Sequence, residues 1–156
     1  MEIREASVDD ATAIVDELWM PFAREMAALD DYNALAADAR DAALEHRREK
    51  LSNPEYCLKL AVEDGTFVGH ASAEIQASAP VFERGAELAI SELYVRPDWR
   101  RQGIASALVE AIEDWGDEWE YETVALSVNV DNHAARDFYE EWGFESRRLK
   151  MVQEMP

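Results

Sequence analysis

Cysteine is almost absent from this sequence, since Cys57 is the only one among 156 residues. A single cysteine excludes an intrachain disulfide and argues against a cysteine-based metal site. Its neighbours, Tyr56 to Leu60, read as a strand, so we expect a buried thiol rather than a nucleophile. Runs of about 18 apolar residues are also absent, as is the pattern of a signal peptide at the first residues. These absences predict a cytoplasmic protein with no metal and no membrane partner.

Positive charge is scarce as well. The chain has 15 basic and 34 acidic residues, which gives a formal net charge of −19, and only three of the basic residues are lysines. This balance argues against binding nucleic acid through its phosphates. Self-repulsion of this size destabilises a compact chain at low ionic strength, whereas salt at about 1 M shortens the Debye length to ~3 Å and screens it. The sequence therefore predicts a halophilic protein; simple solubility or attraction of a basic substrate are the alternatives.

No internal repeat, low-complexity tract or linker divides the chain, and its length suits one domain that spans residues 1–156. Apolar periodicity, turn residues and helix caps predict alternating strands and helices. The expected elements are a strand Ile3–Ser7, a helix through Ile14, Leu18 and Phe22, a helix Leu35–Leu51, a hairpin of strands Tyr56–Glu63 and Phe67–Ala79, a strand Ala86–Val95, a helix from Gly103 to Gly116, a strand Thr123–Val130, a helix Asn132–Trp142 closed by Gly143, and a last strand Phe144–Val152. This order predicts a mixed α/β fold around one sheet.

The junction between the fourth expected strand, Ala86–Val95, and the helix that follows it has the features of an anion site. A strand stops at Pro97, a turn containing Gly103 follows, and an amphipathic helix starts near Ser106. The first N–H groups of a helix have no internal partner, and the helix dipole places positive charge there. Arg100 and Arg101 add charge-assisted donors beside the turn. The junction therefore predicts a pyrophosphate site, although an ordinary turn with exposed arginines has the same local sequence.

Two longer motifs give that junction a context. Residues Val95–Ala105 read V-x-P-x-x-R-x-x-G-x-A, and Asn132–Phe144 read N-x-x-A-x-x-x-Y-x-x-x-G-F. In both content and order they resemble motifs A and B of the GNAT family, the acetyl-CoA-dependent N-acetyltransferases. The likeness covers most of the chain and is weakest between about residues 19 and 80.

The resemblance implies a single GNAT-like domain with a mostly antiparallel sheet and about four helices. In that fold the strands that carry motifs A and B lie side by side and splay apart, which leaves a slot for the pantetheine arm. The resemblance also implies acetyl-CoA as cosubstrate, no metal, and direct transfer of the acetyl group to a primary amine, without a covalent enzyme intermediate.

Residue roles follow from matching the motifs position by position. Backbone amides of motif A would hold the pyrophosphate, and the main chain of the preceding strand would pair with the pantetheine arm. Gly103 would allow the backbone to approach the phosphates closely. The cofactor-binding residues implied in this way are Leu93, Tyr94, Val95, Arg100, Arg101, Gln102, Gly103, Ile104, Ala105, Ser106 and Asn132.

Motif B supplies a candidate acid. Tyr139 lies two helical turns beyond Asn132, on the same face, and its hydroxyl would protonate the departing thiolate of coenzyme A. Core packing is the alternative for Tyr139. Asn132 has the chemistry of a helix N-cap, which is either its whole role or one that it combines with binding the cofactor.

The base is less well defined by the sequence. Family members use a glutamate of the motif A strand, a glutamate of the motif B strand, or water chains, and Ser127 occupies the possible motif B position. Glu92 is the first candidate and Glu87 the second, because partial burial would raise the pKa of such a carboxyl toward neutrality. With 34 acidic residues, chance placement is the alternative. We expect structural or surface roles for the three histidines, His46, His70 and His133.

The amine acceptor is left open between a small molecule and a peptide amine, because its site falls in the region of weakest likeness. Acidic surroundings favour a cationic amine. The candidate lining residues are Trp19, Phe22, Glu25 and Tyr32, with core packing as the alternative for the aromatic ones.

Two other functions compete with acetyl transfer. A coenzyme A sensor or interaction module would keep the phosphate site without catalysis, and the serine at position 127 favours it mildly. A nucleotide-binding domain is disfavoured because no Gly-x-x-x-x-Gly-Lys-Ser/Thr occurs. The sequence leaves open whether the chain forms a homodimer.

Overall fold

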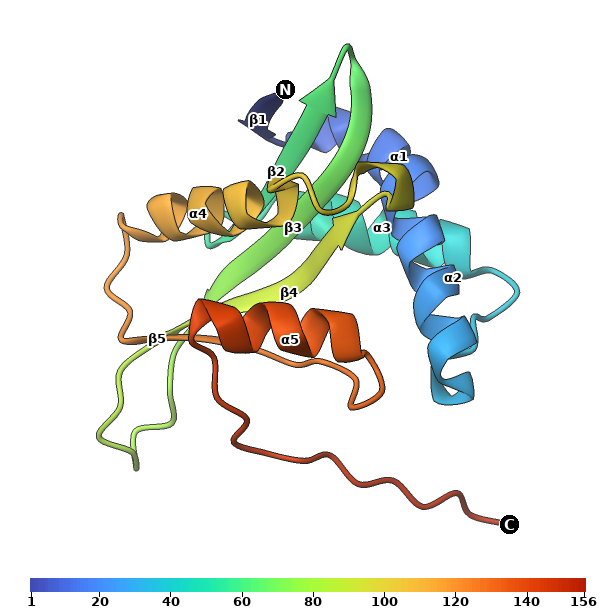
Figure 1. The fold of residues 1–156 in the computed structure, drawn as a ribbon. Helices are drawn as coiled ribbons and strands as arrows, with labels where there is room; N and C mark the ends of the chain where they lie inside the picture. Colours follow the sequence, from blue (N-terminus) through green and yellow to red (C-terminus); the bar gives the residue numbers. More distant parts are fainter.

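The computed structural model describes all residues from 1 to 156 and contains one five-stranded sheet in the order β1-β2-β3-β4-β5 (Figure 1). The strands are β1 Glu2–Glu5, β2 Tyr56–Glu63, β3 Thr66–Gln76, β4 Glu87–Val95 and β5 Thr123–Leu126. The first four strands pair antiparallel with their neighbours, and β5 runs parallel to β4. The expected mixed α/β fold with a mostly antiparallel sheet is confirmed.

Five α-helices accompany the sheet. They are α1 Ala11–Ile14, α2 Met20–Leu29, α3 Ala39–Leu51, α4 Ile104–Gly116 and α5 His133–Trp142. Short 3₁₀ turns at Val8–Asp10, Asp31–Asn33 and Pro97–Trp99 complete the connections, and a π-helical turn, Val15–Trp19, joins α1 to α2. No helix has the length and apolar character needed to cross a membrane.

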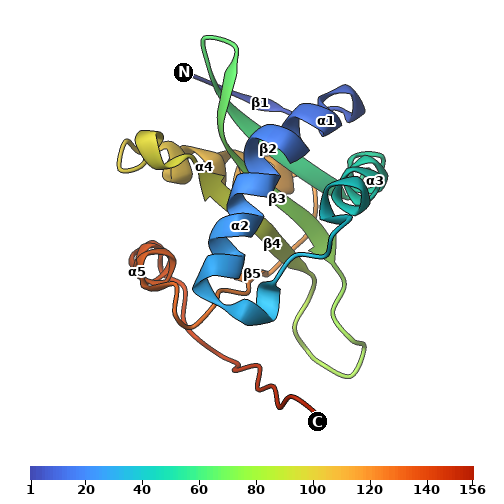
Figure 2. The ribbon, with the colours of Figure 1, turned by 90° about the vertical axis from the view of Figure 1, so that its right-hand side faces the viewer.

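Apolar side chains form two cores, one on each face of the sheet. The stripe Ile104, Leu108 and Ile112 of α4 packs against β3 and β4 on one face, as its spacing predicts. On the other face, Ile14 and Leu18 pack against Leu58 and Leu60 of β2. Figure 2 shows α4 and α5 together on one side of the sheet and α3 on the other. The helices that the family motifs describe and the N-terminal helices therefore lie on opposite faces.

The π-helical turn has an identifiable cause. Pro21 has no N–H, so it cannot donate the regular helical hydrogen bond to the carbonyl of Glu17, four residues earlier. Arg96, just past the end of β4, donates to that carbonyl from Nη2 at 3.1 Å. The break in the helix thus creates an acceptor that fastens the start of α2 to the end of β4.

The hairpin of β2 and β3 follows its predicted boundaries closely. Asp64 and Gly65 form its turn with φ values of 48° and 78°, the left-handed conformation that an Asp-Gly pair adopts in two-residue hairpins. Cys57 lies buried in β2, as expected, and burial raises the pKa of its thiol to about 12.

Two predicted strands differ in the structure. The strand expected over Thr123–Val130 ends at Leu126, because the next residues turn toward α2, where Asn129 donates to the carboxylate of Asp30 at 2.9 Å. The β5 side chains are half-buried or exposed, so the expectation of burial on both faces is wrong.

The last expected strand, Phe144–Val152, is absent. Phe144 packs against Tyr139 with ring centroids 5.7 Å apart, but residues 145–156 are exposed and pair with no strand. In Figure 1 this tail runs away from the body of the protein.

Candidate cofactor and acceptor site

Half of β4 has an unpaired edge. The strand pairs with β5 only from Glu87 to Ile90, and from Ser91 to Val95 it has a partner on its β3 side alone. The strands of the two motifs therefore splay after Ile90, which the sequence by itself does not reveal. Leu93, Tyr94 and Val95, which we predicted to bind the pantetheine arm, all lie on this open edge. An extended ligand with amide groups can add there as a strand does.

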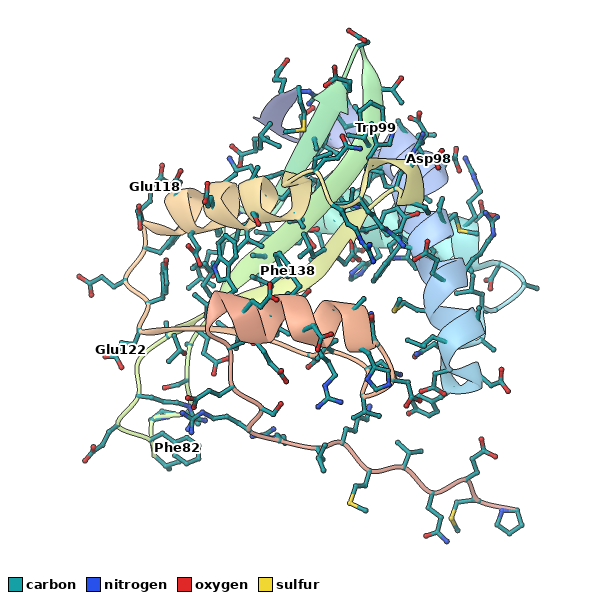
Figure 3. The ribbon with its side chains drawn as sticks, viewed as in Figure 1. Phe82, Asp98, Trp99, Glu118, Glu122 and Phe138 are labelled. Atoms are coloured by element: carbon teal, nitrogen blue, oxygen red, sulfur yellow. The ribbon has the colours of Figure 1, made fainter.

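The open edge leads into the turn before α4. The 3₁₀ turn Pro97–Trp99 follows β4 (Figure 3), and then Arg101 and Gly103 adopt φ values of 61° and 80°. The hydrogen bonds of the helix begin with the Ala107 N–H, which donates to the Gly103 carbonyl at 3.1 Å, and no side chain caps the helix start. The N–H groups of the first turn are therefore available to an anion, at the positive end of the helix dipole.

Gly103 is required here by its backbone conformation. A φ of 80° is strained for a residue with a side chain, and a Cβ at this position would meet no atom within 4 Å. The space in front of the backbone is thus open on the side where a phosphate would have to approach. Arg101, two residues before Gly103, adopts the same left-handed region although it is not a glycine.

Arg100 is engaged with protein groups. Its Nε donates to the Val95 carbonyl at 2.8 Å, its Nη2 donates to both carboxylate oxygens of Glu25 at 2.9 Å, and it lies 5.6 Å from the centre of the Tyr94 ring. Arg100 therefore fastens α2 to the turn, a role that the sequence did not indicate. Gln102 donates weakly to the Asp98 carbonyl at 3.4 Å, and Arg101 is exposed.

The motif B residues lie on α5. The side chain of Asn132 accepts a hydrogen bond from the Ala135 N–H at 3.2 Å, so it caps the helix as predicted, and Gly143 ends the helix with a φ of 105°. Tyr139 packs edge-on against Phe138 and Phe144, and burial raises the pKa of its hydroxyl to about 12.

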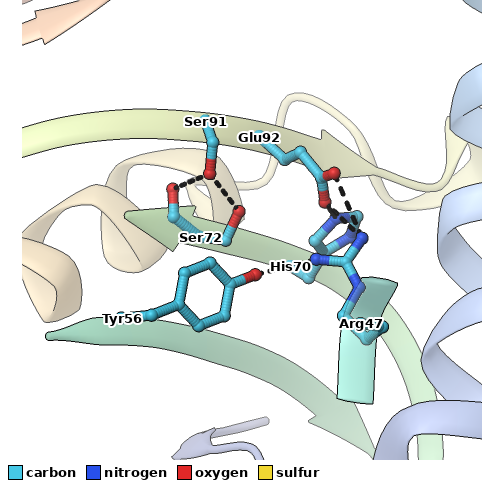
Figure 4. Close-up of polar contacts among 6 residues, drawn as sticks. All are labelled: Arg47, Tyr56, His70, Ser72, Ser91 and Glu92. Atoms are coloured by element: carbon cyan, nitrogen blue, oxygen red, sulfur yellow. Dashed lines mark hydrogen bonds and ion pairs between the residues drawn. The ribbon is translucent and has the colours of Figure 1, made fainter. Parts of the chain in front are cut away.

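Glu92 belongs to a polar network under the N-terminal helices (Figure 4). Arg47 of α3 donates from Nη2 to its two oxygens at 2.8 and 3.1 Å, and His70 of β3 places Nε2 2.9 Å from Oε1. The Arg47 Nη1 also donates to the Tyr56 hydroxyl at 2.8 Å. Ser72 and Ser91 bond to each other next to this group at 2.8 Å.

The network determines the protonation of Glu92. Burial by itself would raise the pKa of this carboxyl, but the hydrogen bond to His70 and the charge of Arg47 outweigh it and lower the pKa to about 2. The expectation of a pKa raised toward neutrality is therefore wrong for Glu92. Glu87, the second candidate, pairs with Thr123 at the opposite end of β4 from the splay, and Ser127 is exposed just after β5.

Sequence reasoning missed two members of this network. Arg47 lies in a charged helix and is 45 residues from Glu92, so nothing in its local pattern separates it from exposed neighbours such as Arg48. His70 was expected in a structural or surface role, and it is fully buried beside Glu92. His46 and His133 are exposed, as expected.

Two adjoining grooves lie between the N-terminal helices and share Trp19. Groove 1, of about 300 Å³, is lined by Trp19, Ala39, Ala42, Ala43, His46 and Arg47. Groove 2, of about 330 Å³, is lined by Trp19 together with Phe22, Ala23, Met26, Asn33, Ala34 and Leu35. Both grooves border residues that contact β4, since Arg47 binds Glu92 and the Phe22 ring lies 5.8 Å from that of Tyr94.

The structure brings together only some of the predicted acceptor residues. Trp19 and Phe22 line the grooves, whereas Glu25 is bound to Arg100 and Tyr32 is exposed in the following turn. No three or more His, Cys, Asp or Glu side chains are grouped so that they could hold a metal ion.

Comparison with known proteins agrees with this arrangement. Residues 13–144 match the model of the acetyltransferase (GNAT) family. An L-amino acid N-acetyltransferase, AaaT of Escherichia coli (strain K12), is 32% identical over 87 residues, which cover 55% of this chain. That alignment spans about half, 51%, of the length of the relative.

Solved structures resemble the whole chain. A predicted acetyltransferase from Clostridium acetobutylicum, solved with acetyl-CoA, superimposes with a TM-score of 0.77 at 18% identity, covering 98% of this chain and 95% of the other. The aminoglycoside acetyltransferase AAC(6')-Iy, solved with a bisubstrate analogue, gives a TM-score of 0.72 at 19% identity, with coverages of 99% and 98%. At these identities the likeness shows a shared fold.

Proposed function

Because this chain belongs to the acetyltransferase (GNAT) family, we propose that it transfers the acetyl group of acetyl-CoA to a primary amine by direct attack within a ternary complex. One observation carries the proposal: the open edge of β4 from Ser91 to Val95 runs directly into the uncapped N-terminus of α4 at Gly103. A strand edge and an anion site in series match the two ends of a coenzyme A molecule, its amide-bearing arm and its pyrophosphate.

The residues of the turn would hold the cosubstrate. The N–H groups from Arg101 to Ser106 face the pyrophosphate in this proposal, and the exposed side chains of Arg101 and Gln102 lie beside it. Arg100 would contribute by fixing the turn against Glu25 and Val95, and its remaining N–H groups would be available to the ligand. Asn132 would combine its capping bond with a contact to the arm.

The chemistry is shared between β4 and α5. Main-chain N–H groups on the open edge of β4 would stabilise the oxyanion that forms when the amine adds to the thioester carbonyl. Tyr139 would donate the proton that the departing thiolate needs; its raised pKa of about 12 keeps the hydroxyl protonated throughout the neutral range. Glu92 would act as an ionised carboxylate on the acceptor side of β4.

We place the acceptor in grooves 1 and 2, since both end at residues that contact Glu92 or Tyr94. Amino acids and aminoglycosides are the acceptors that the names of two similar proteins suggest.

The test is release of the coenzyme A thiol from acetyl-CoA, followed with a thiol reagent while a panel of primary amines is supplied. Amine-dependent release is expected. A protein that binds acetyl-CoA and acetylates none of the amines would instead be the coenzyme A sensor or interaction module considered above.

A further inference from the structure

The acceptor grooves contain no negative charge. More than one residue in five of this chain is acidic, yet none of the twelve residues that line the two grooves is aspartate or glutamate. The one residue with a permanent charge is Arg47, which is positive and buried. The grooves thus differ in charge from the rest of the molecule.

Three carboxylates of the elements that contribute to the grooves are paired with arginines. Asp16 binds Arg40 at 2.6 Å, Glu25 binds Arg100 at 2.9 Å, and Glu92 binds Arg47 at 2.8 Å. A polyamine or an aminoglycoside carries several ammonium groups, and each needs a carboxylate or carbonyl partner when water is removed. These three carboxylates are therefore not free to provide those partners, and the lining itself supplies none.

The groove walls are instead apolar. Trp19 forms a wall common to both grooves, with alanines opposite it in groove 1 and Phe22, Met26 and Leu35 in groove 2. Such surfaces gain free energy by covering the aliphatic or aromatic part of a ligand.

From this lining we propose that the acceptor is a monoamine with an apolar body, which seats against Trp19, and that polycationic amines are poor acceptors. The inference rests on the acetyl transfer proposed above, and it names the substrate class of the same site. It separates this chain from the aminoglycoside acetyltransferases that share its fold.

The experiment compares 2-phenylethylamine with spermidine and kanamycin in the thiol-release assay, at an ionic strength that screens the acidic surface. The value of kcat/KM for 2-phenylethylamine should exceed those for the polycations by roughly 100-fold, as burial of a phenylethyl group implies. Higher kcat/KM for a polycation would overturn the substrate class and leave acetyl transfer intact.

A filled groove provides the structural control. Ala42→Trp places a large ring in groove 1 from an exposed helical position and should raise KM for 2-phenylethylamine at least about tenfold. Ala77→Trp makes the same change at an exposed residue that lines neither groove, so it should leave KM unchanged. If no amine is acetylated, binding of 2-phenylethylamine is measured by calorimetry. Binding to wild type but not to Ala42→Trp would support the acceptor site even though acetyl transfer fails. Absence of binding to wild type would overturn the proposed acceptor site.

A separate observation concerns the proton that the amine must lose. His70 is fully buried, and its Nε2 must carry the hydrogen because the Glu92 carboxylate can only accept. Its Nδ1 then holds an unshared electron pair and has no hydrogen-bond partner. A buried acceptor without a partner is unfavourable, so it is rare in folded proteins.

The surroundings of His70 connect it to the acceptor site. The ring lies edge-on to Phe22, 6.5 Å between centroids, and Phe22 lines groove 2. The groups around it are Phe22 of α2, Tyr94 and Glu92 of β4, and Arg47 of α3, which reaches it through Glu92. His70 thus lies directly behind the wall of the groove.

We infer that Nδ1 of His70 takes the proton of the acceptor ammonium through one water, with Glu92 as its positioning residue. One ammonium N–H bond breaks and one Nδ1–H bond forms, and the freed electron pair of the amine then forms the new C–N bond. As the C–S bond of the thioester breaks, Tyr139 gives its proton to the thiolate, and the second proton that the nitrogen loses replaces the one that Tyr139 has given. Glu92 stabilises the imidazolium, which afterwards releases its proton to water.

His70→Gln keeps a donor for Glu92 but removes the basic nitrogen. It should lower kcat/KM by about 10²- to 10⁴-fold and remove the acidic limb of its pH profile, with acetyl-CoA affinity retained. His133→Gln, at an exposed histidine outside the site, should keep both rate and limb. A His70→Gln profile with its acidic limb intact would overturn the role. If that variant does not fold, ¹⁵N NMR of the wild-type protein without substrate shows which ring nitrogen of His70 carries the hydrogen. A hydrogen on Nδ1 would contradict the inference.

Discussion

At the scale of single residues, Glu92 shows how a partner sets the chemistry of a carboxylate. Its side chain is only 17% exposed, and burial alone would favour the neutral form. Arg47 and His70 reverse that preference, since both contact the carboxylate within 3 Å. The sequence suggested that Glu92 is a general base with a pKa near neutrality. In the structure it is instead an ionised carboxylate that links α3 to β4 through Arg47.

Because Glu92 is ionised in the folded protein, we predict that the free energy of unfolding depends on pH. The folded pKa of Glu92, about 2, lies below the ordinary value of 4.5, so its contribution is complete above pH 4.5 and is lost as pH falls toward 2. The difference corresponds to on the order of 3 kcal/mol. Glu92→Gln should lower the free energy of unfolding near pH 7 by a similar amount and flatten its decline below pH 4.5, measured by urea unfolding. A decline as steep as that of wild type would show that another carboxyl is responsible.

Tyr139 carries the second prediction at this scale. Tyr139→Phe removes only the hydroxyl, so the packing against Phe138 and Phe144 is kept. Turnover should fall by about 10²- to 10⁴-fold while the Kd of acetyl-CoA changes little. With a pKa of about 12, this hydroxyl should produce no alkaline loss of activity below about pH 11. Wild-type turnover in the variant would exclude Tyr139 as the acid.

At the scale of helices and strands, the turn between β4 and α4 is the element on which the function depends. Gly103→Ala adds a methyl group in a left-handed conformation and in the space open to a phosphate. Gly65 provides a matched control, because its φ of 78° is nearly the same and its Cβ position is also open, but it lies in the β2–β3 turn.

Gly103→Ala and Gly65→Ala should therefore destabilise the fold similarly, by about 1 kcal/mol. Only Gly103→Ala should weaken acetyl-CoA binding, by tenfold or more, in a calorimetric titration. Equal affinities in the two variants would place the pyrophosphate elsewhere.

The helices and strands also show which parts of the fold can be predicted from the sequence. Periodicity and turn chemistry are local, so they predicted β2, β3, β4 and α4 closely, and the two motifs indicated the turn at Gly103. The end of β5, the exposed tail after Phe144 and the partners of Arg47 depend on contacts between distant segments. Such contacts leave no local pattern, and for that reason the splay of β4 and β5, the grooves and the His70 network emerged only in three dimensions.

At the scale of the whole molecule, the charge of −19 is spread over a surface whose carboxylates are only partly paired. Because most of this repulsion is screened at molar salt, the melting temperature should fall by roughly 10 °C or more when NaCl is lowered from 2 M to 0.05 M. Thermal scans at several salt concentrations measure this directly. A melting temperature independent of salt would rule out adaptation to a salt-rich cytoplasm.

The same charge makes the cofactor site an exception within the molecule. A coenzyme A pyrophosphate must approach an acidic surface. The proposed site binds it with main-chain N–H groups and the helix dipole of α4. When the ligand is close, salt screens these interactions less than it screens the repulsion from exposed charges. Binding should therefore be weak at low salt and stronger when the surface is screened.

The central claim is tested most directly by calorimetric titration of the purified protein with acetyl-CoA at high salt. The account predicts one saturable site per chain, with affinity that increases between low and high salt and is at least tenfold weaker in Gly103→Ala. Absence of detectable binding at every ionic strength would contradict it.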